Sequence, residues 1–265
     1  MVPRRLIFAF SVFEGCLENR AVRLHMESIR RWCGVFDDAV FVFMGDRRHA
    51  IPVMEELLGI GFKGIQFRFR EEDDGLYEAA VFRDEIFGTS DNDGRMCFFA
   101  HSKGITNYGM YPERQIDIWI TSMWYMNMYD ADAIRKRFMT QYFSLFHGTF
   151  KKQCDEDGSL YMYEGTFYWL LPGKLKKMLG PSGEPPLYSR WWAEYLPQSV
   201  PEPYMGSFAG LRFLHDRWSL YLQADLYVEY MFNKAIENDG NDSVYIDYQS
   251  YLKDLGLDIN LNVKA

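Results

Sequence analysis

Short apolar runs alternate with amphipathic stretches along the first hundred residues of the chain. The apolar runs are rich in aromatic and β-branched residues and end at glycines or charged turns, which is typical of buried strands. Between two of them, Val22, Met26, Ile29 and Cys33 recur at helical spacing, opposite a charged face. We expect strands at residues 6–11, 39–44 and 65–69, a fourth strand from residue 96, and helices at 17–33, 51–58 and 75–87.

Strands that alternate with helices predict an α/β fold with a mostly parallel sheet flanked by helices. The second half of the chain is richer in helical patterns, and its aromatic run 160–169 resembles a strand interrupted at Gly165. Asp130 precedes a helical pattern and is expected to cap that helix. We expect further helices at 113–128, 130–143, 174–179 and 218–238.

Charge and cysteine content narrow the function classes. The net charge of −8 argues against a sequence-independent nucleic-acid binder without excluding nucleic acid as a partner. The four cysteines form no C-x-x-C pair and predict reduced thiols, which suits a cytoplasmic protein. No stretch has transmembrane length, and the apolar run after Arg4-Arg5 is too short for a signal peptide.

The fourth apolar run ends on His101-Ser102-Lys103-Gly104. In open α/β sheets, ligands bind beyond the carboxyl ends of the strands. Lys103 carries a compact positive charge that suits phosphate oxygens, and Gly104 would let a backbone approach a ligand closely. The ordinary alternative is a structural histidine next to a solvated lysine. We therefore treat this segment as a candidate site.

Three acidic pairs have the Asp-x-Asp spacing that a divalent metal would use, and the adjacent Asp73-Asp74 matches it more loosely. The pair before the fourth strand lies at its amino end, away from where ligands bind, and the others are explained as a helix cap or turn residues. We assign no metal ligand, and a divalent metal (Mn²⁺ or Mg²⁺) stays open as a cofactor. The pairs are Asp73/Asp74, Asp91/Asp93, Asp130/Asp132 and Asp155/Asp157.

Three blocks resemble motifs of one protein family. The segment 97–104 resembles the Y-x-H-[ST]-K-G signature of glycosyltransferase-like proteins that occur in bacterial surface-polysaccharide clusters and in some viruses. Residues 164–169 are similar to that family's [SG]-G-N-F-W-W block, with Thr166 in place of Asn and Tyr168 in place of the first Trp. Residues 190–194 are similar to its R-[YF]-x-x-E block. The resemblance covers roughly residues 95–200.

The resemblance implies a GT-A-like fold that transfers a sugar from a nucleotide-sugar donor to an acceptor hydroxyl, on a glycan or glycolipid. It implies one domain with a nucleotide-binding half at 1–104, an acceptor and catalytic half at 105–217, and a C-terminal helical extension at 218–265. Two alternatives stay open. One is a phage-type transferase for DNA bases, for which Arg47, Arg48, Lys151 and Lys152 would form a basic groove, and the other is a non-catalytic nucleotide- or sugar-binding protein.

Glycosyl transfer builds negative charge on the leaving diphosphate, so a cation must meet it there. Lys103 together with His101 could supply this charge without a metal. An inverting transfer also needs a carboxylate or a histidine to take the proton of the acceptor hydroxyl. Glu194 is the first candidate because it lies in a matched block, and Glu164 is the second. The ordinary alternative for Glu194 is a salt bridge to Arg190 at helical spacing.

Two further groups complete the predicted site. Residues at the ends of the first two strands could stack on or hydrogen-bond the donor nucleotide, together with the segment 101–104. Residues of the other two matched blocks could line the sugar and acceptor, since aromatic rings pack on sugars. Core packing is the ordinary role for any one aromatic ring. The donor group is Phe10, Ser11, Phe13, Asp46, His101, Lys103 and Gly104, and the sugar group is Gly165, Thr166, Trp169, Arg190 and Trp191.

Overall fold

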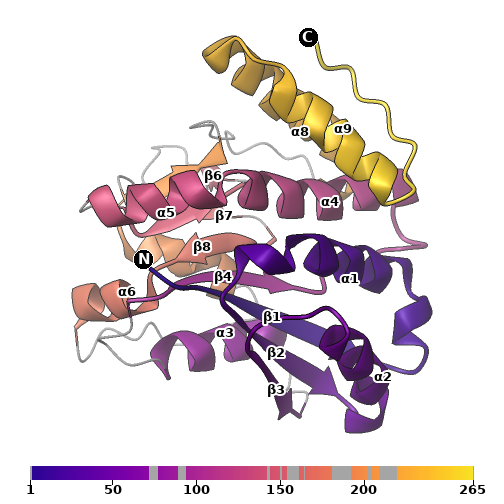
Figure 1. The fold of residues 1–265 in the computed structure, drawn as a ribbon, viewed down its shortest axis with the longest axis vertical. Coiled ribbons are helices and arrows are strands. Elements are labelled where there is room, and N and C mark those ends of the chain that lie inside the picture. The colour runs from indigo at the N-terminus through magenta and orange to yellow at the C-terminus, as the bar shows by residue number, and fades with distance from the viewer. Residues whose placement is uncertain are drawn as a thin grey trace.

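The computed structural model describes residues 2–71, 77–88, 94–141, 144–149, 151–153, 161–163, 165–180, 192–201, 204–208 and 220–264. Its centre is a seven-stranded sheet with the order β3-β2-β1-β4-β8-β5-β9. Figure 1 shows helices on both faces of this sheet. The fold is therefore α/β, as the alternating pattern predicts.

The N-terminal half forms the parallel part of the sheet. Strand β1 lies in the middle and pairs in parallel with β2 and β4, and β2 pairs in parallel with β3. Each strand is followed by a helix, which confirms the predicted alternation to within a few residues at each boundary. The elements are β1 (Arg4–Val12), α1 (Arg20–Trp32), β2 (Asp38–Gly45), α2 (Arg47–Leu58), β3 (Ile65–Arg70), α3 (Tyr77–Phe87) and β4 (Met96–His101).

The second half adds short strands to the other edge. Strand β8 pairs antiparallel with both β4 and β5, and β5 pairs in parallel with β9. The predicted strand at 160–169 consists of two short strands, β7 and β8, of which β7 pairs with β6 in a separate two-stranded sheet. The elements are α4 (Glu113–Tyr129), α5 (Ala131–Thr140), β5 (Phe146–Gly148), β6 (Lys151–Gln153), β7 (Tyr161–Tyr163), β8 (Tyr168–Leu170), α6 (Pro172–Leu179), α7 (Trp192–Tyr195) and β9 (Met205–Ser207).

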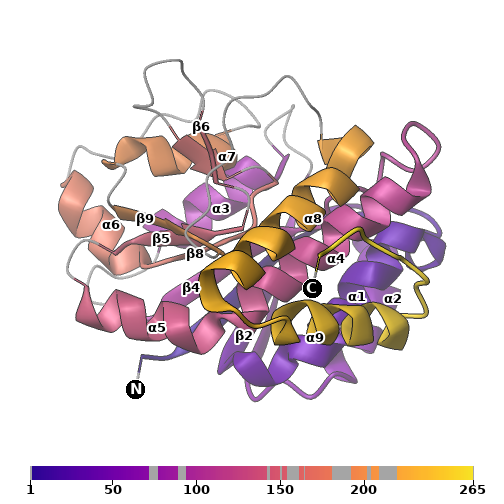
Figure 2. The same ribbon diagram turned by 90° about the horizontal axis from the view of Figure 1, so that it is seen from above.

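Two helices end the chain, α8 (Leu220–Asp239) and α9 (Ser243–Asp254). Helix α8 contains one non-helical residue, Gln223, and lies alongside α4, as both views show (Figures 1 and 2). The pattern predicts α8 but not α9. None of the helices in the described ranges is both long and apolar enough to cross a bilayer.

Side chains of alternate residues on β1 and β4 enter two different cores. Phe8 and Phe98 face the core shared with α1, α2 and α4, whereas Ile7 and Phe99 face the core shared with α3 and α6. A strand that is buried on both faces reads as a continuous apolar run, which explains the pattern of these segments. Strand β4 therefore runs through the centre of the molecule.

Asp130 occupies the predicted N-cap position of α5, but its side chain does not form the expected cap. The Asp130 side chain makes no capping hydrogen bond, and the helix that follows ends at Thr140 rather than at residue 143. Burial, and then the charge of Asp239, raises the pKa of the Asp130 carboxyl. The residue sits at the junction of α4 and α5, where φ −95° and ψ 9° differ from the extended conformation usual for a capping residue.

Candidate functional site

The end of β4 is held firmly against β1. The backbone N–H of Ser102 donates to the carbonyl of Ala9 at 2.9 Å, and the Ser102 hydroxyl accepts from the N–H of Ser11 at 3.0 Å. Gly104 follows with φ +92°, a conformation that favours glycine. A Cβ there would lie 3.0 Å from Ile120 on α4. The backbone therefore turns sharply at Gly104, directly after Lys103.

Lys103 and Glu194 form an ion pair at the end of β4. The Nζ atom of Lys103 lies 3.2 Å from Oε1 of Glu194, although the two residues are 91 positions apart in the sequence. Their side chains are only 10% and 7% exposed, so water screens the pair weakly. The Lys103 ammonium also lies 5.5 Å from the centre of the Trp119 ring. Tertiary folding thus joins the predicted cation to the first-choice carboxylate.

Gly165 connects this pair to His101. Its N–H donates to the same Glu194 oxygen at 3.1 Å, and its carbonyl lies 3.1 Å from Nε2 of His101. A carbonyl only accepts, so Nε2 of His101 carries the proton in this hydrogen bond. Residues from three predicted blocks, on β4, before β8 and on α7, therefore meet at one place.

His101 does not supply positive charge to the site, which corrects the prediction that it acts as a cation. Burial, and then the charge of Lys103, lower the pKa of its imidazole to about 3. The ring is therefore neutral near pH 7. Its Nδ1 atom lies 3.5 Å from a carboxylate oxygen of Glu78 on α3.

The turn at Gly165 and Thr166 is strained. Thr166 is a β-branched residue with φ +56°, and such a conformation is a genuine outlier for that residue type. Its side chain is fully buried, and within the described residues its hydroxyl has no hydrogen-bond partner. Strained backbone and unsatisfied buried groups persist only where surrounding contacts impose them, often at functional sites. Here the bonds from Gly165 to Glu194 and His101 impose the turn.

The donor-binding predictions have mixed outcomes. Phe10 is fully buried, and its ring packs against Phe41 and Phe43, so the prediction that it stacks on a base is wrong. Asp46 caps α2 by accepting from the N–H of Arg48, and its hydrogen bonds to Arg48 lower the pKa of its carboxyl to about 2. The ring of Phe13 is 36% exposed beyond β1. Donor contacts by Phe13 and Asp46 stay predictions.

Trp169 is not a platform for a sugar. Its side chain is fully buried, it packs against Phe98 at a ring distance of 5.1 Å, and its indole N–H donates to the carbonyl of Asn127. The neighbouring rings of residues 167 and 168 are buried as well. These aromatics form core because β8 lies inside the sheet. The predicted site residues Glu164, Arg190 and Trp191 lie outside the described residues.

The described residues contain no group of three or more His, Cys, Asp or Glu side chains placed to hold a metal. Of the four acidic pairs, only Asp130/Asp132 is described, and Asp132 forms ion pairs with Arg4 and Arg135. The basic groove considered for DNA is described only in part. Its Arg47 lies over the ring of Phe69, while its Arg48 pairs with a carboxylate and the side chains of residues 151 and 152 are not described.

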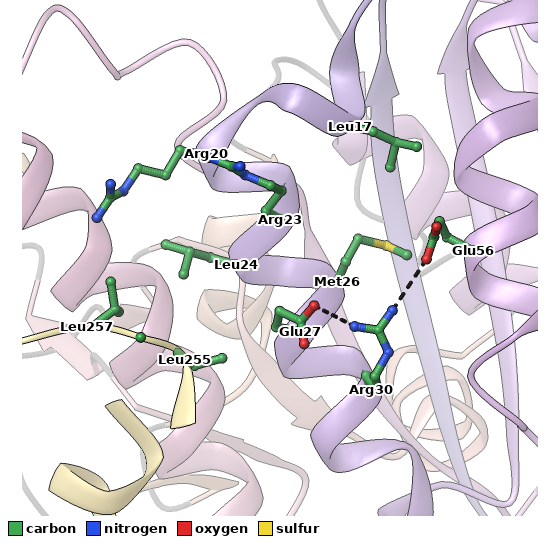
Figure 3. Close-up of a pocket in the computed structure, with 11 residues that line it drawn as sticks. Leu17, Arg20, Arg23, Leu24, Met26, Glu27, Arg30, Glu56, Leu255 and Leu257 are labelled. Atoms are coloured by element: carbon green, nitrogen blue, oxygen red, sulfur yellow. Dashed lines mark hydrogen bonds and ion pairs between the residues drawn. The ribbon is translucent and has the colours of Figure 1, made fainter. Parts of the chain in front are cut away.

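A cavity of about 470 Å³ lies over α1, bordered by α2 and by residues 255–257. Figure 3 shows the side chains that line it. Two of its arginines are held by carboxylates, Arg20 by Asp117 and Arg30 by Glu27 and Glu56. None of the predicted site residues lines it. The cavity is therefore distinct from the site at the end of β4.

Sequence reasoning missed two residues that touch the site, His25 on α1 and Glu78 on α3. Nε2 of His25 lies 2.9 Å from the carbonyl oxygen of Lys103. The helical spacing offers a signal, because His25 follows Val22 by three residues on the core face of α1. A polar side chain at a core position needs a partner, but the sequence does not say which.

Comparisons with known proteins add little about function. No protein-family model and no curated protein matches the chain. Among solved structures, the crystal structure of 4-diphosphocytidyl-2C-methyl-D-erythritol synthase from Anaerococcus prevotii is similar, with a TM-score of 0.40 and 8% identity. The match covers 95% of this chain and 99% of that chain. A similarity at this level carries no information about activity.

Proposed function

We propose that the protein is a glycosyltransferase that moves a sugar from a nucleotide-sugar donor to a hydroxyl of a glycan or glycolipid. The observation that carries this proposal is the buried pair of Lys103 and Glu194 directly beyond β4. A cation and a carboxylate at one place are the two groups that the transfer needs, one for the leaving group and one for the acceptor proton. The motif resemblance supports the same assignment.

The topology supports a nucleotide at this end of the sheet. Strands β1, β2 and β4 are parallel neighbours, and the register pairs Val12 with Gly45 and Ala9 with His101. Their carboxyl ends therefore lie at the same edge, where ligands bind in open α/β sheets. A diphosphate bound beyond that edge would lie next to Lys103.

In the free protein, Lys103 and Glu194 neutralise each other. When the donor binds, its diphosphate takes the place of Glu194 opposite the Lys103 ammonium. Glu194 then accepts the proton of the acceptor hydroxyl as that oxygen bonds to the anomeric carbon. The bond from the anomeric carbon to the diphosphate oxygen breaks, and its electron pair leaves with the diphosphate, whose growing charge Lys103 stabilises.

The proposal is tested by release of nucleoside diphosphate from a panel of nucleotide-sugars, with glycan, glycolipid and duplex DNA acceptors, in Mn²⁺ and in EDTA. We expect Lys103→Met and Glu194→Gln to lower turnover by on the order of 10²-fold, because each removes charge stabilisation or proton transfer. Lys136→Met, on the exposed face of α5, is the matched control and should keep full activity.

Two results would contradict the proposal. Full turnover in Lys103→Met would remove the lysine from the chemistry. Thermal stabilisation of the wild-type protein by nucleotides, without release or transfer from any donor, would identify a binding protein instead. DNA as the sole acceptor would favour the base-modifying alternative.

A further inference from the structure

His25 is a fully buried histidine on α1 for which the proposed chemistry has no role. Its Nδ1 atom lies 3.0 Å from the indole Nε1 of Trp124, and its Nε2 atom lies 2.9 Å from the carbonyl oxygen of Lys103. An indole N–H only donates and a carbonyl only accepts. Nδ1 must therefore accept and Nε2–H must donate, which defines a single neutral tautomer.

The imidazolium form of His25 would break this arrangement. A proton on Nδ1 would face the N–H of Trp124, so two donors would meet and one hydrogen bond would be lost. Burial is the largest cause that lowers the pKa of His25, to about 3. The ring is therefore neutral in the pH range where most enzymes work.

Packing keeps the ring in this orientation. Phe167, which follows the strained turn, stacks on it with ring centres 6.0 Å apart, and Phe8 on β1 meets it edge-on at 5.4 Å. Six residues earlier, at the N-cap of α1, the Asn19 side-chain amide donates to the carbonyl of Ile105 at 3.3 Å. Helix α1 and its capping residue thus bind two carbonyls of the loop that carries Lys103.

We propose that His25 is a positioning residue of the site, which places Lys103 by donating from its neutral Nε2–H to the Lys103 carbonyl. The next residue, Gly104, is a glycine with φ +92° whose backbone lies against Ile116 and Ile120 on α4, and the His25 hydrogen bond acts on the carbonyl directly before it. Without His25 the peptide could turn and carry the Lys103 ammonium away from Glu194. The kinetic consequence rests on the proposed function, whereas the hydrogen bond itself can be tested without it.

The kinetic test compares two substitutions at His25. His25→Phe keeps a ring but removes the donor, and we expect kcat for nucleoside diphosphate release to fall by on the order of tenfold or more, with a smaller change in acceptor KM. His25→Gln returns an N–H donor at the position of Nε2 and should recover most of the rate. Ile29→Val disturbs the core packing of α1 without removing a hydrogen bond, and it should keep kcat within about twofold while lowering Tm.

A wild-type kcat in His25→Phe, or equal losses in His25→Phe and His25→Gln, would overturn the inference. Nuclear magnetic resonance tests the hydrogen bond without any measurement of activity. Long-range ¹⁵N correlations should show a proton on Nε2 alone between pH 8 and pH 5, and the Gly104 amide should shift in His25→Phe much more than in His25→Gln. An Nδ1–H tautomer or an imidazolium in that range would also overturn the inference. Absence of transfer from every donor would instead reject the proposed function.

Discussion

At the scale of single residues, Thr166 combines two unfavourable features, a positive φ at a β-branched residue and a buried hydroxyl that no described residue satisfies. Each costs on the order of 1–3 kcal/mol. The turn persists because Glu194 and His101 hold both backbone groups of Gly165. Strain at this turn is therefore coupled to the groups of the proposed site.

At position 166, glycine should give a more stable protein than alanine, whereas at most positions alanine is the more stabilising of the two. We expect Thr166→Gly to be more stable than Thr166→Ala by about 1 kcal/mol, because glycine adopts a positive φ without strain. Urea unfolding measures the difference. Ala133→Gly, inside α5, is the reference and should cost about 1 kcal/mol. Equal stability of the two variants at position 166 would show that the backbone there is unstrained.

Buried neutral histidines predict a loss of stability in acid. The pKa values of His25 and His101 are lowered to about 3, so below pH 6.5 the unfolded chain takes up protons that the folded protein does not. For each ring, the free energy of unfolding should fall by about 1.4 kcal/mol per pH unit from pH 6.5 down towards pH 3. Above pH 6.5 both rings are neutral in the folded and the unfolded protein, so their contribution to stability no longer changes with pH.

Urea unfolding between pH 8 and pH 4 measures this dependence. His25→Phe should lower the free energy of unfolding at pH 8 and also flatten its decline below pH 6.5, because one of the two titrating groups is gone. A decline as steep as that of the wild type would show that His25 is protonated in the folded protein.

At the scale of elements, α4 fixes the loop that carries Lys103. Gly104 packs its backbone against Ile116 and Ile120 on the first turns of α4, where a Cβ would come within 3.0–3.1 Å. We expect Gly104→Ala to destabilise the protein by about 2 kcal/mol, through positive φ and close contact together. Gly34→Ala is the matched control, since a Cβ there meets no atom within 4 Å, and it should change stability by less than about 0.5 kcal/mol.

Thermal unfolding monitored by circular dichroism compares the two variants. A Gly104→Ala protein as stable as Gly34→Ala would show that the loop adapts easily, and Lys103 would then lack a rigid support. A loss of stability in Gly104→Ala alone would indicate that the turn at Gly104 is rigid.

At the scale of the whole molecule, α9 joins helices that are distant in the sequence. The hydroxyl of Tyr251 lies 2.7 Å from Ser28 on α1, and the hydroxyl of Tyr248 lies 3.0 Å from Thr121 on α4. Both tyrosine side chains are fully buried. The C-terminal helix therefore holds together the two helices that support the Lys103 loop.

Removing the Tyr251 hydroxyl should cost little compared with removing the ring. We expect Tyr251→Phe to destabilise by about 1 kcal/mol, because Ser28 keeps its bond to the Leu24 carbonyl. Tyr251→Ala should cost about 3–5 kcal/mol through the cavity that it leaves. Urea unfolding separates the two, and equal losses would assign the role of Tyr251 to its hydroxyl alone.

The sequence by itself determined the parallel half of the sheet, because strands buried on both faces leave continuous apolar runs and amphipathic helices leave apolar residues at helical spacing. It also located the polar end of β4. The three-residue strands β5, β8 and β9 are too short to carry a period, and pairing with distant strands defines them. Only the tertiary structure decided that Phe10 and Trp169 are core residues.

The same division holds for the site. The end of an apolar run marked Lys103 and the motif resemblance marked Glu194, but their contact joins residues 91 positions apart, and no local pattern records such a distance. The neutral state of His101 and the partners of His25 depend on burial and on which donor or acceptor lies opposite each nitrogen. Burial and hydrogen-bond partners are properties of the packed molecule, so only the tertiary structure could decide them.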